Sequence, residues 1–245
     1  MIQTGPKFRN QMLRFGREWK QGEHVLITGP TGSGKTTLAR HVIDQRILRG
    51  GFVIVMVGKL TPDPTLTEEY KGFTRWTSMR NGLGRYRTPH PHENKILLWP
   101  DIEKLKGIDA KRDKQRAIFR DAFDYMASKG KWTVQVDEGL YTVSPAHLNL
   151  GRELGMLHAL GRTSNVSLVT LAQRPSHLPL VIYGSASHAY VGRANTLEDR
   201  KRLSELGTKE APKEIGNTIA TLARREFLWL PVAIDAPAEL VNVGE

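Results

Sequence analysis

The sequence contains no cysteine among its 245 residues. The chain can therefore form no disulfide, thiolate zinc site, iron–sulfur cluster or cysteine nucleophile, and nothing points to an oxidising compartment. No apolar run approaches the roughly 18 to 20 residues of a membrane-spanning helix, and the opening residues MIQTGPKFRN lack the apolar core of a secretory signal. From these absences we expect no membrane segment and a location in the cytoplasm.

Acidic side chains are in the minority. Lys and Arg total 36 against 25 Asp and Glu, which gives a formal net charge of +11. This surplus favours a polyanionic partner such as nucleic acid, although an acidic substrate or a membrane surface would also fit. Residues 71–131 hold 15 Lys or Arg and 7 Asp or Glu, so most of the surplus lies in about a quarter of the chain.

Alternating strand and helix patterns predict an α/β fold. A buried-type strand at 24–28, a glycine-rich turn, a helix that ends at paired glycines and a strand at 52–57 make a βαβ unit with parallel strands. Before this unit, helical spacing predicts that four large apolar side chains share one face and join the core: Phe8, Met12, Phe15 and Trp19. We expect an N-terminal helical segment over residues 1–22 and one domain over residues 23–245.

The rest of the chain continues this pattern. Residues 71–131 are basic and partly irregular, with a charged helix around 109–128. A final apolar run at 227–234 contains Pro231, which favours an edge strand or a hairpin. Further strands are predicted at 95–100, 133–136, 167–172 and 189–192, with a helical segment at 145–160.

Residues 29–36 read GPTGSGKT and match the P-loop pattern G-x-x-x-x-G-K-[ST] between a predicted strand and a predicted helix. Glycines let backbone N–H groups curl around phosphate oxygens, and the helix N-terminus adds a partial positive charge. Lys35 is expected to reach the β- and γ-phosphates of ATP, and the Thr36 hydroxyl to ligate Mg²⁺. A glycine turn that binds no nucleotide is the alternative. The predicted nucleotide-binding residues are Gly29, Pro30, Thr31, Gly32, Ser33, Gly34, Lys35, Thr36 and Thr37.

A buried-type strand ends in two adjacent carboxylates. In WTVQVDEG, alternating β-formers are followed by Asp137 and Glu138. Successive residues at a strand end point in different directions, so Asp137 can hold the Mg²⁺ shell while Glu138 polarises the attacking water. The alternative is a solvated strand end, because neighbouring carboxylates also occur by chance.

The next strand, SLVTLA, runs into Gln173, Arg174 and Pro175. A P-loop, a strand that ends in DE and a strand that ends in a TLAQRP element together resemble the HerA/FtsK group of ASCE P-loop ATPases. That group includes double-stranded DNA translocases, conjugation coupling ATPases and genome-packaging ATPases of phages and viruses. The resemblance covers roughly residues 23–205, and its most specific piece is the QRP element.

The resemblance implies a RecA-like fold whose mostly parallel sheet has the order 5-1-4-3-2 and is flanked by helices. In that order, the strand before Gln173 lies between the P-loop strand and the strand before Asp137, so Gln173 would sit beside the γ-phosphate as a sensor. The resemblance also implies a homo-oligomeric ring of five or six subunits that acts on double-stranded DNA. In a phage system the ring would work in the host cytoplasm, together with a portal protein.

Arg162 follows a predicted helix, at the place where related motors carry an arginine. It should lie at the sheet edge opposite the P-loop, from which it could reach only the nucleotide of a neighbouring subunit. We therefore predict that it stabilises transition-state charge in trans. Arg193 and Arg200, which also follow a strand, are the competing candidates. The predicted catalytic residues are thus Lys35, Glu138, Gln173 and Arg162.

The basic segment is the predicted DNA contact. Its arginines could neutralise phosphates without reading sequence, and binding would then weaken steeply with salt. Tyr86, between two of these arginines, could stack on a base. A solvated helix face is the alternative for a charge run of this kind. The predicted contacts are Arg75, Arg80, Arg85 and Arg87, with Lys111, Arg112, Lys114 and Arg116 as further candidates.

The motifs favour a Mg²⁺-dependent ATPase that moves double-stranded DNA, in the manner of a phage-type packaging motor. One departure is that Gly58 and Lys59 stand where related motors often carry an acidic residue after the second strand. A P-loop kinase or phosphotransferase is the alternative enzyme class, although Glu138 beside Asp137 favours activation of water over transfer to an acceptor. A Zot-like assembly or secretion ATPase, which would pair the P-loop domain with a membrane segment, is the third interpretation.

Overall fold

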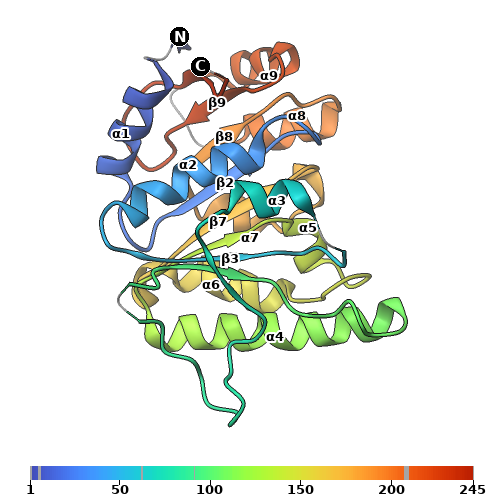
Figure 1. Ribbon diagram of the computed structural model, residues 1–245. Helices are drawn as coiled ribbons and strands as arrows, with labels where there is room; N and C mark the ends of the chain where they lie inside the picture. Colours follow the sequence, from blue (N-terminus) through green and yellow to red (C-terminus); the bar gives the residue numbers. More distant parts are fainter. Residues whose placement is uncertain (1, 5–6, 62, 91, 207–209, 245) are drawn as a thin grey trace.

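In the part of the chain that the structure describes, a ten-stranded sheet organises the fold. Helices lie on both faces of this sheet (Figure 1). The computed structural model describes residues 2–4, 7–61, 63–90, 92–206 and 210–244. Five adjacent parallel strands form the centre of the sheet. In sheet order they are β8 (Ala186–Val191), β2 (His24–Thr28), β7 (Val166–Ala172), β6 (Trp132–Val136) and β3 (Phe52–Met56).

Numbered along the chain, these central strands lie in the order 5-1-4-3-2. The predicted α/β class and strand order are therefore confirmed, and β7 lies between β2 and β6. Because the three strands are parallel, their carboxyl ends meet at one edge of the sheet. This edge brings together the segments that follow Thr28, Val136 and Ala172.

Shorter strands extend the centre on both sides. Beyond β3, the chain adds β5 (Lys95–Leu98) and then β4 (Thr74–Trp76), both in parallel pairing. Beyond β8, it adds the antiparallel strands β9 (Glu226–Leu230) and β10 (Glu239–Asn242), and β1 (Gln3–Thr4) pairs parallel with β10. The sheet is thus mostly parallel, with antiparallel pairing near one side.

The predicted C-terminal hairpin is present as β9 and β10, but β9 is not an edge strand. It pairs with β8 on one side and with β10 on the other. Pro231 lies directly after Leu230, the last paired residue of β9, so its missing N–H interrupts no ladder of hydrogen bonds. The position of the proline, rather than its presence, therefore decides where the strand can lie.

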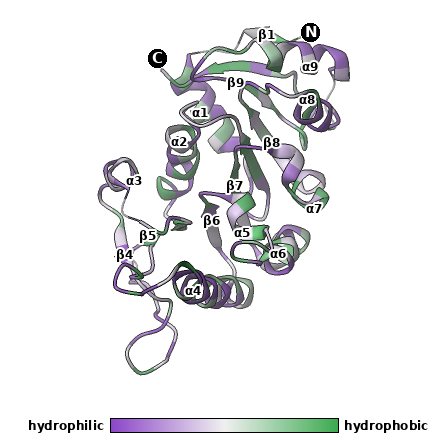
Figure 2. Cartoon of the chain, turned by 90° about the vertical axis from the view of Figure 1, so that its right-hand side faces the viewer, coloured by the Kyte–Doolittle hydropathy of each residue, from purple (hydrophilic) through white to green (hydrophobic). Residues whose placement is uncertain are grey.

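Helices cover the two faces of the sheet in separate layers (Figure 2). One layer holds α1 (Phe8–Glu18), α2 (Lys35–Ile47) and α3 (Pro64–Glu69). The other holds α4 (Ile108–Lys129), α5 (Gly139–Val143), α6 (Gly151–Ser164), α7 (Leu180–Gly184), α8 (Leu197–Ser204) and α9 (Pro212–Thr221). Val25 and Ile27 pack with the first layer and Leu26 with the second, because successive strand residues face opposite sides.

The N-terminal helix α1 packs its apolar stripe into the core. Phe8, Met12, Phe15 and Trp19 are each at most 8% exposed, so the prediction that they join the core is confirmed. The rings of Phe15 and Trp19 stack with centroids 5.3 Å apart. Residues 1, 5 and 6 of the predicted N-terminal segment lie outside the described part of the chain.

Candidate active site

The P-loop connects the end of β2 to the start of α2. Gly32 and Gly34 have positive φ angles of 76° and 95°, which glycine adopts without a steric penalty. α2 begins at Lys35 directly after this turn, and the N–H groups of its first turn have no partner within the helix. Loop and helix N-terminus therefore make a concavity suited to phosphate anions.

Lys35 lies between the P-loop and the carboxylates that follow β6. Its Nζ atom donates a hydrogen bond to the backbone oxygen of Pro30, 2.9 Å away. Burial lowers the pKa of Lys35, and the nearby charges of Glu138 and Asp137 oppose this shift. The side chain thus stays close to its own loop, in the field of both carboxylates.

Asp137 and Glu138 follow β6 at the carboxyl edge of the sheet, as predicted. Asp137 is 8% exposed, and burial raises its pKa to about 6 despite the opposing charge of Lys59. Glu138 occupies the N-cap position of α5, and burial raises its pKa as well. The hydrogen bond from Gln173 and the charges of Lys35 and Lys59 partly oppose that shift.

The two residues predicted to hold Mg²⁺, Asp137 and Thr36, would each bind the ion through side-chain oxygen atoms. Burial and nearby charges, and no hydrogen bond from a described residue, set the pKa of the Asp137 carboxylate. A buried carboxylate without hydrogen bonds is stabilised in its charged form by a cation, and carboxylate and hydroxyl oxygens are ligands that Mg²⁺ accepts. Asp137 and the hydroxyl of Thr36, in the first turn of α2, therefore fit this ion.

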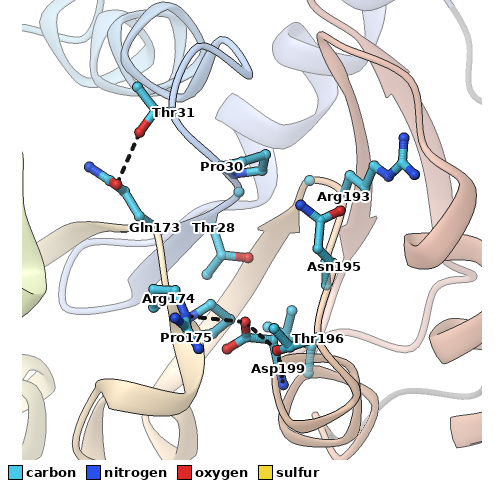
Figure 3. A pocket seen from close by; sticks show the side chains of 14 residues that line it. Thr28, Pro30, Thr31, Gln173, Arg174, Pro175, Arg193, Asn195, Thr196 and Asp199 are labelled. Carbon is cyan, nitrogen blue, oxygen red and sulfur yellow. Dashed lines mark hydrogen bonds and ion pairs between the residues drawn. The ribbon is translucent and has the colours of Figure 1, made fainter.

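Gln173 joins the P-loop to Glu138. Its Nε2 atom donates to Oε2 of Glu138 at 2.9 Å, and its Oε1 atom accepts from the hydroxyl of Thr31 at 3.0 Å (Figure 3). The strand order places Gln173 after β7, between the segments that carry its two partners. The three predicted elements of the site are therefore in direct contact.

Two adjoining cavities open beside the P-loop. The larger, of about 690 Å³, is lined by residues 30–33, Arg193, Asn195 and residues 222–224. The smaller, of about 330 Å³, reaches from Thr28–Thr31 to Gln173 and to the start of α8 (Figure 3). Arg224 Nε donates to the backbone oxygen of Gly32 at 3.0 Å, which ties the segment before β9 to the P-loop.

Sequence reasoning missed most of these lining residues. Asn195, Leu222 and Arg224 come from segments after β8 and α9 and match no part of the P-loop motif. Arg193, the competing candidate for the trans arginine, lines both cavities beside its own P-loop. Only the strand order of the C-terminal extension could have indicated that these segments lie here.

Arg162 lies near the amino ends of the central strands, at the opposite end of the sheet from the P-loop, where it was expected. It is exposed in the last turn of α6 and lines a hollow of about 390 Å³ with His24 and Ala186, which begin β2 and β8. The P-loop follows the other end of β2, so Arg162 cannot belong to the P-loop cavities of its own chain. Arg200 is partly buried on α8 and donates to the backbone oxygen of Thr196.

Three of the four predicted DNA-contacting arginines lie in a short hairpin, residues 79–87. Its ends are joined by a hydrogen bond from the Arg87 amide to the Met79 carbonyl, 2.9 Å. Arg80 pairs with both carboxylate oxygens of Asp121 at 2.8 and 2.9 Å and packs over the ring of Tyr86. Its guanidinium therefore helps to organise the hairpin, while the side chain stays exposed.

The other arginines differ in how they are held. Arg87 packs over the ring of Trp76, and Arg75 on β4 packs over Trp99. Arg85 is exposed near the tip of the hairpin. The ring of Tyr86, expected to stack on a base, lies 5.0 Å from that of Tyr125 and is half-buried. All four predicted arginines are thus exposed, and of the four only Arg85 has neither a side-chain hydrogen bond nor a ring contact among the described residues.

The chain has the fold of a RecA-like P-loop NTPase. It is similar to the genome packaging NTPase B204 of Sulfolobus turreted icosahedral virus 2 bound to AMP, with 17% identity, a TM-score of 0.60 and coverage of 91% of this chain and 98% of that one. It is also similar to VirB4 of Thermoanaerobacter pseudethanolicus, with 11% identity, a TM-score of 0.60 and coverage of 89% and 88%.

A third similar structure is the pCW3 conjugation coupling protein TcpA bound to ATPγS, with 15% identity, a TM-score of 0.55 and coverage of 90% of this chain and 59% of that one. No family model matches the sequence, and no curated protein matches it either. The similar structures thus show the fold of this chain, a RecA-like P-loop NTPase fold. Within the described residues, no helix combines the length and hydrophobicity of a bilayer span.

Proposed function

We propose that this protein is a Mg²⁺-dependent ATPase. The observation that carries the proposal is the meeting of P-loop, carboxylates and glutamine at the ends of three neighbouring strands. Lys35 follows β2, Glu138 follows β6 and Gln173 follows β7, and the last two are directly hydrogen-bonded. Phosphoryl transfer depends mainly on positioning and charge stabilisation, which such a cluster supplies.

Each residue has a distinct part in hydrolysis. Glu138 orients a water molecule and accepts its proton as the new bond to the γ-phosphorus forms and the bond to the β–γ bridging oxygen breaks. Lys35 and the P-loop amides stabilise charge on the phosphate oxygens. Asp137 and Thr36 would hold Mg²⁺, which would supply further positive charge to the phosphates.

The larger cavity is the proposed nucleoside site. It adjoins the P-loop and is lined by the apolar side chain of Leu222 and by polar groups of Asn195, Arg193 and Arg224. An apolar wall with a few polar groups is the usual lining of a pocket that binds a planar base and a sugar. B204 has been solved with AMP, ATPγS and AMPPCP, which supports nucleotide binding by this fold.

Arg162 is the proposed trans arginine of a homo-oligomeric ring, whose five or six subunits are inferred from the resemblance alone. Beside it, α6 and α7 expose four apolar side chains, which are Met156, Leu160, Leu180 and Val181, each between 38% and 66% exposed. The helices α6 and α7 pack against each other, so they present one surface. A second copy of the chain would cover this surface and receive Arg162 at its nucleotide.

Movement of double-stranded DNA, in the manner of viral genome packaging, is the proposed use of the hydrolysis. One similar structure is described as a genome packaging NTPase and another as a conjugation coupling protein. The basic hairpin, with Arg85 exposed and Arg87 beside it, is the proposed backbone contact, and Arg80 supports its shape. A portal protein in the host cytoplasm would complete such a motor.

Phosphate release should be measured with and without linear double-stranded DNA under conditions that favour assembly. We expect hydrolysis that DNA stimulates. Hydrolysis without any DNA effect, in an assembled protein, would contradict translocation and favour a secretion-type ATPase. Transfer of the phosphate to an acceptor molecule instead of water would favour the phosphotransferase and overturn the ATPase itself.

A further inference from the structure

Thr31 stands at a P-loop position where the motif accepts any residue, yet its side chain has a specific partner. The hydroxyl donates to Oε1 of Gln173 at 3.0 Å, across 142 residues of chain. Backbone N–H groups carry the phosphate-binding role of the loop, so the motif itself does not need this hydroxyl. Any further role of the Thr31 side chain therefore lies in its hydrogen bond to Gln173.

The chemistry of the three groups fixes the direction of their hydrogen bonds. The carboxylate of Glu138 only accepts, so Gln173 presents its NH₂ group to Oε2 of Glu138 at 2.9 Å. The amide oxygen of Gln173 then points the other way, toward Thr31, whose hydroxyl has to donate (Figure 3). Loss of the hydroxyl would remove one of the two hydrogen bonds that fix the Gln173 amide and leave only the bond to Glu138.

We propose that Thr31 is a positioning residue for hydrolysis, which orients the Gln173 amide and through it the Glu138 carboxylate. The proposal rests on the proposed ATPase function. It makes the P-loop contribute to the placement of the attacking water as well as to phosphate binding. A rearrangement of the P-loop around bound nucleotide would therefore move Glu138 through two hydrogen bonds, from Thr31 to Gln173 and from Gln173 to Glu138.

The alternative is that the Thr31 hydroxyl binds the nucleotide directly. The two roles separate in kinetics, because loss of a nucleotide contact weakens binding, whereas loss of positioning slows the chemical step. Thr31 is exposed at the cavity mouth, so its replacement creates no cavity in the core. Variants at this position should therefore fold.

The test compares Thr31→Val, which keeps the shape and removes the hydroxyl, with Thr31→Ser, which keeps the hydroxyl. We expect Thr31→Val to lower kcat about fivefold, the effect of one hydrogen bond, with KM and the Kd for a fluorescent ATP analogue unchanged within twofold. Thr31→Ser should restore kcat. Thr67→Val, at an exposed threonine of α3 with a local hydrogen bond, is the matched control and should match the wild type.

A double-mutant cycle supplies the second readout. Because Thr31 acts through Gln173, Thr31→Val should cause no further loss of kcat in a Gln173→Leu background. Multiplied losses in the double variant, or a raised Kd with kcat unchanged in Thr31→Val, would overturn the inference. An inactive wild-type protein would instead refute the proposed function, so the two failures are distinguishable.

Discussion

Gly58, just after β3, lies against Tyr141 of α5: a Cβ atom at Gly58 would be 3.1 Å from Cδ1 of Tyr141 and 3.7 Å from the Cβ atom of Glu138. The Tyr141 hydroxyl donates to Oε1 of Gln115, whose Nε2 donates to the backbone oxygen of Val57. The ring therefore occupies space that a side chain at position 58 would need. This packing is a physical reason for the glycine.

Gly58→Asp should destabilise the protein and slow hydrolysis, because the new side chain pushes on Tyr141 and on the start of α5, where Glu138 lies. We expect a loss of about 1 to 3 kcal/mol in the free energy of unfolding, typical of overpacking. Denaturant unfolding and phosphate release measure the two effects. Gly216→Ala on α9, where an added Cβ meets no atom within 4 Å, is the matched control and should not lower stability.

The proposed trans arginine predicts complementation between inactive variants. Arg162→Ala keeps its own P-loop site intact but offers no arginine to its neighbour, whereas Glu138→Gln lacks the base but keeps Arg162. Mixing the two proteins should therefore restore part of the phosphate release that each lacks alone. Arg200→Ala, mixed with Glu138→Gln in the same way, serves as the control, because Arg200 is not the proposed trans arginine.

Two outcomes would contradict this assignment. Arg162→Ala with full turnover under assembly conditions would show that the residue is not needed. Arg162→Ala that is inactive alone and also after mixing, although a size measurement shows mixed oligomers, would place its effect within its own chain.

A buried histidine pair beside Arg162 predicts acid-sensitive stability. His24 Nε2 donates to the backbone oxygen of His158 and its Nδ1 accepts from the amide of Leu168, so the ring has no site for a second proton. Burial lowers the pKa of His24 from 6.5 to about 4, and that of His158 also falls. The stability from neutral His24 is therefore present above pH 6.5 and lost as the pH falls toward 4.

For His24 alone the loss amounts to about 3 kcal/mol across that range. Denaturant unfolding at several pH values should show this slope in the wild type and a smaller one in His24→Gln. His90→Gln, at an exposed histidine, should keep the wild-type slope. An unchanged slope in His24→Gln would refute the prediction.

Charge reversal in the basic hairpin should weaken DNA binding. Arg85→Glu with Arg87→Glu removes two proposed phosphate contacts, so the affinity should fall and the salt dependence should lose about two counterions. Fluorescence anisotropy with a DNA duplex over a salt series measures both. Arg17→Glu with Arg49→Glu, at two exposed arginines near α1 and α2, gives the same net charge and should bind more tightly than the hairpin variant. Equal affinities would remove the hairpin from the DNA site.

The sequence predicted the parts of the site that depend on local motifs. The P-loop, the carboxylates after β6 and Gln173 after β7 all follow from short patterns, and the resemblance supplied the strand order that brings them together. The pairing of Arg80 with Asp121, and of Thr31 with Gln173, joins residues far apart in the chain. Such contacts depend on packing between elements, which no local periodicity encodes.

The same limit applies to the nucleoside cavity. Arg224 reaches Gly32 across 192 residues, because β9 returns the chain to the side of the P-loop. The residues that line this cavity after β8 and α9 match no sequence motif. A charge count likewise treats all arginines as equal, whereas in the structure Arg80 pairs with Asp121 and packs over Tyr86.

The central claim is that Glu138 activates water for ATP hydrolysis. Its most direct test is phosphate release by Glu138→Gln, with Glu103→Gln, at an exposed glutamate outside the site, as the control. We predict that Glu138→Gln lowers kcat at least about 100-fold, as loss of a general base does, while the Kd for an ATP analogue stays within a few-fold of the wild type. A Glu138→Gln protein that hydrolyses ATP at the wild-type rate would contradict the account.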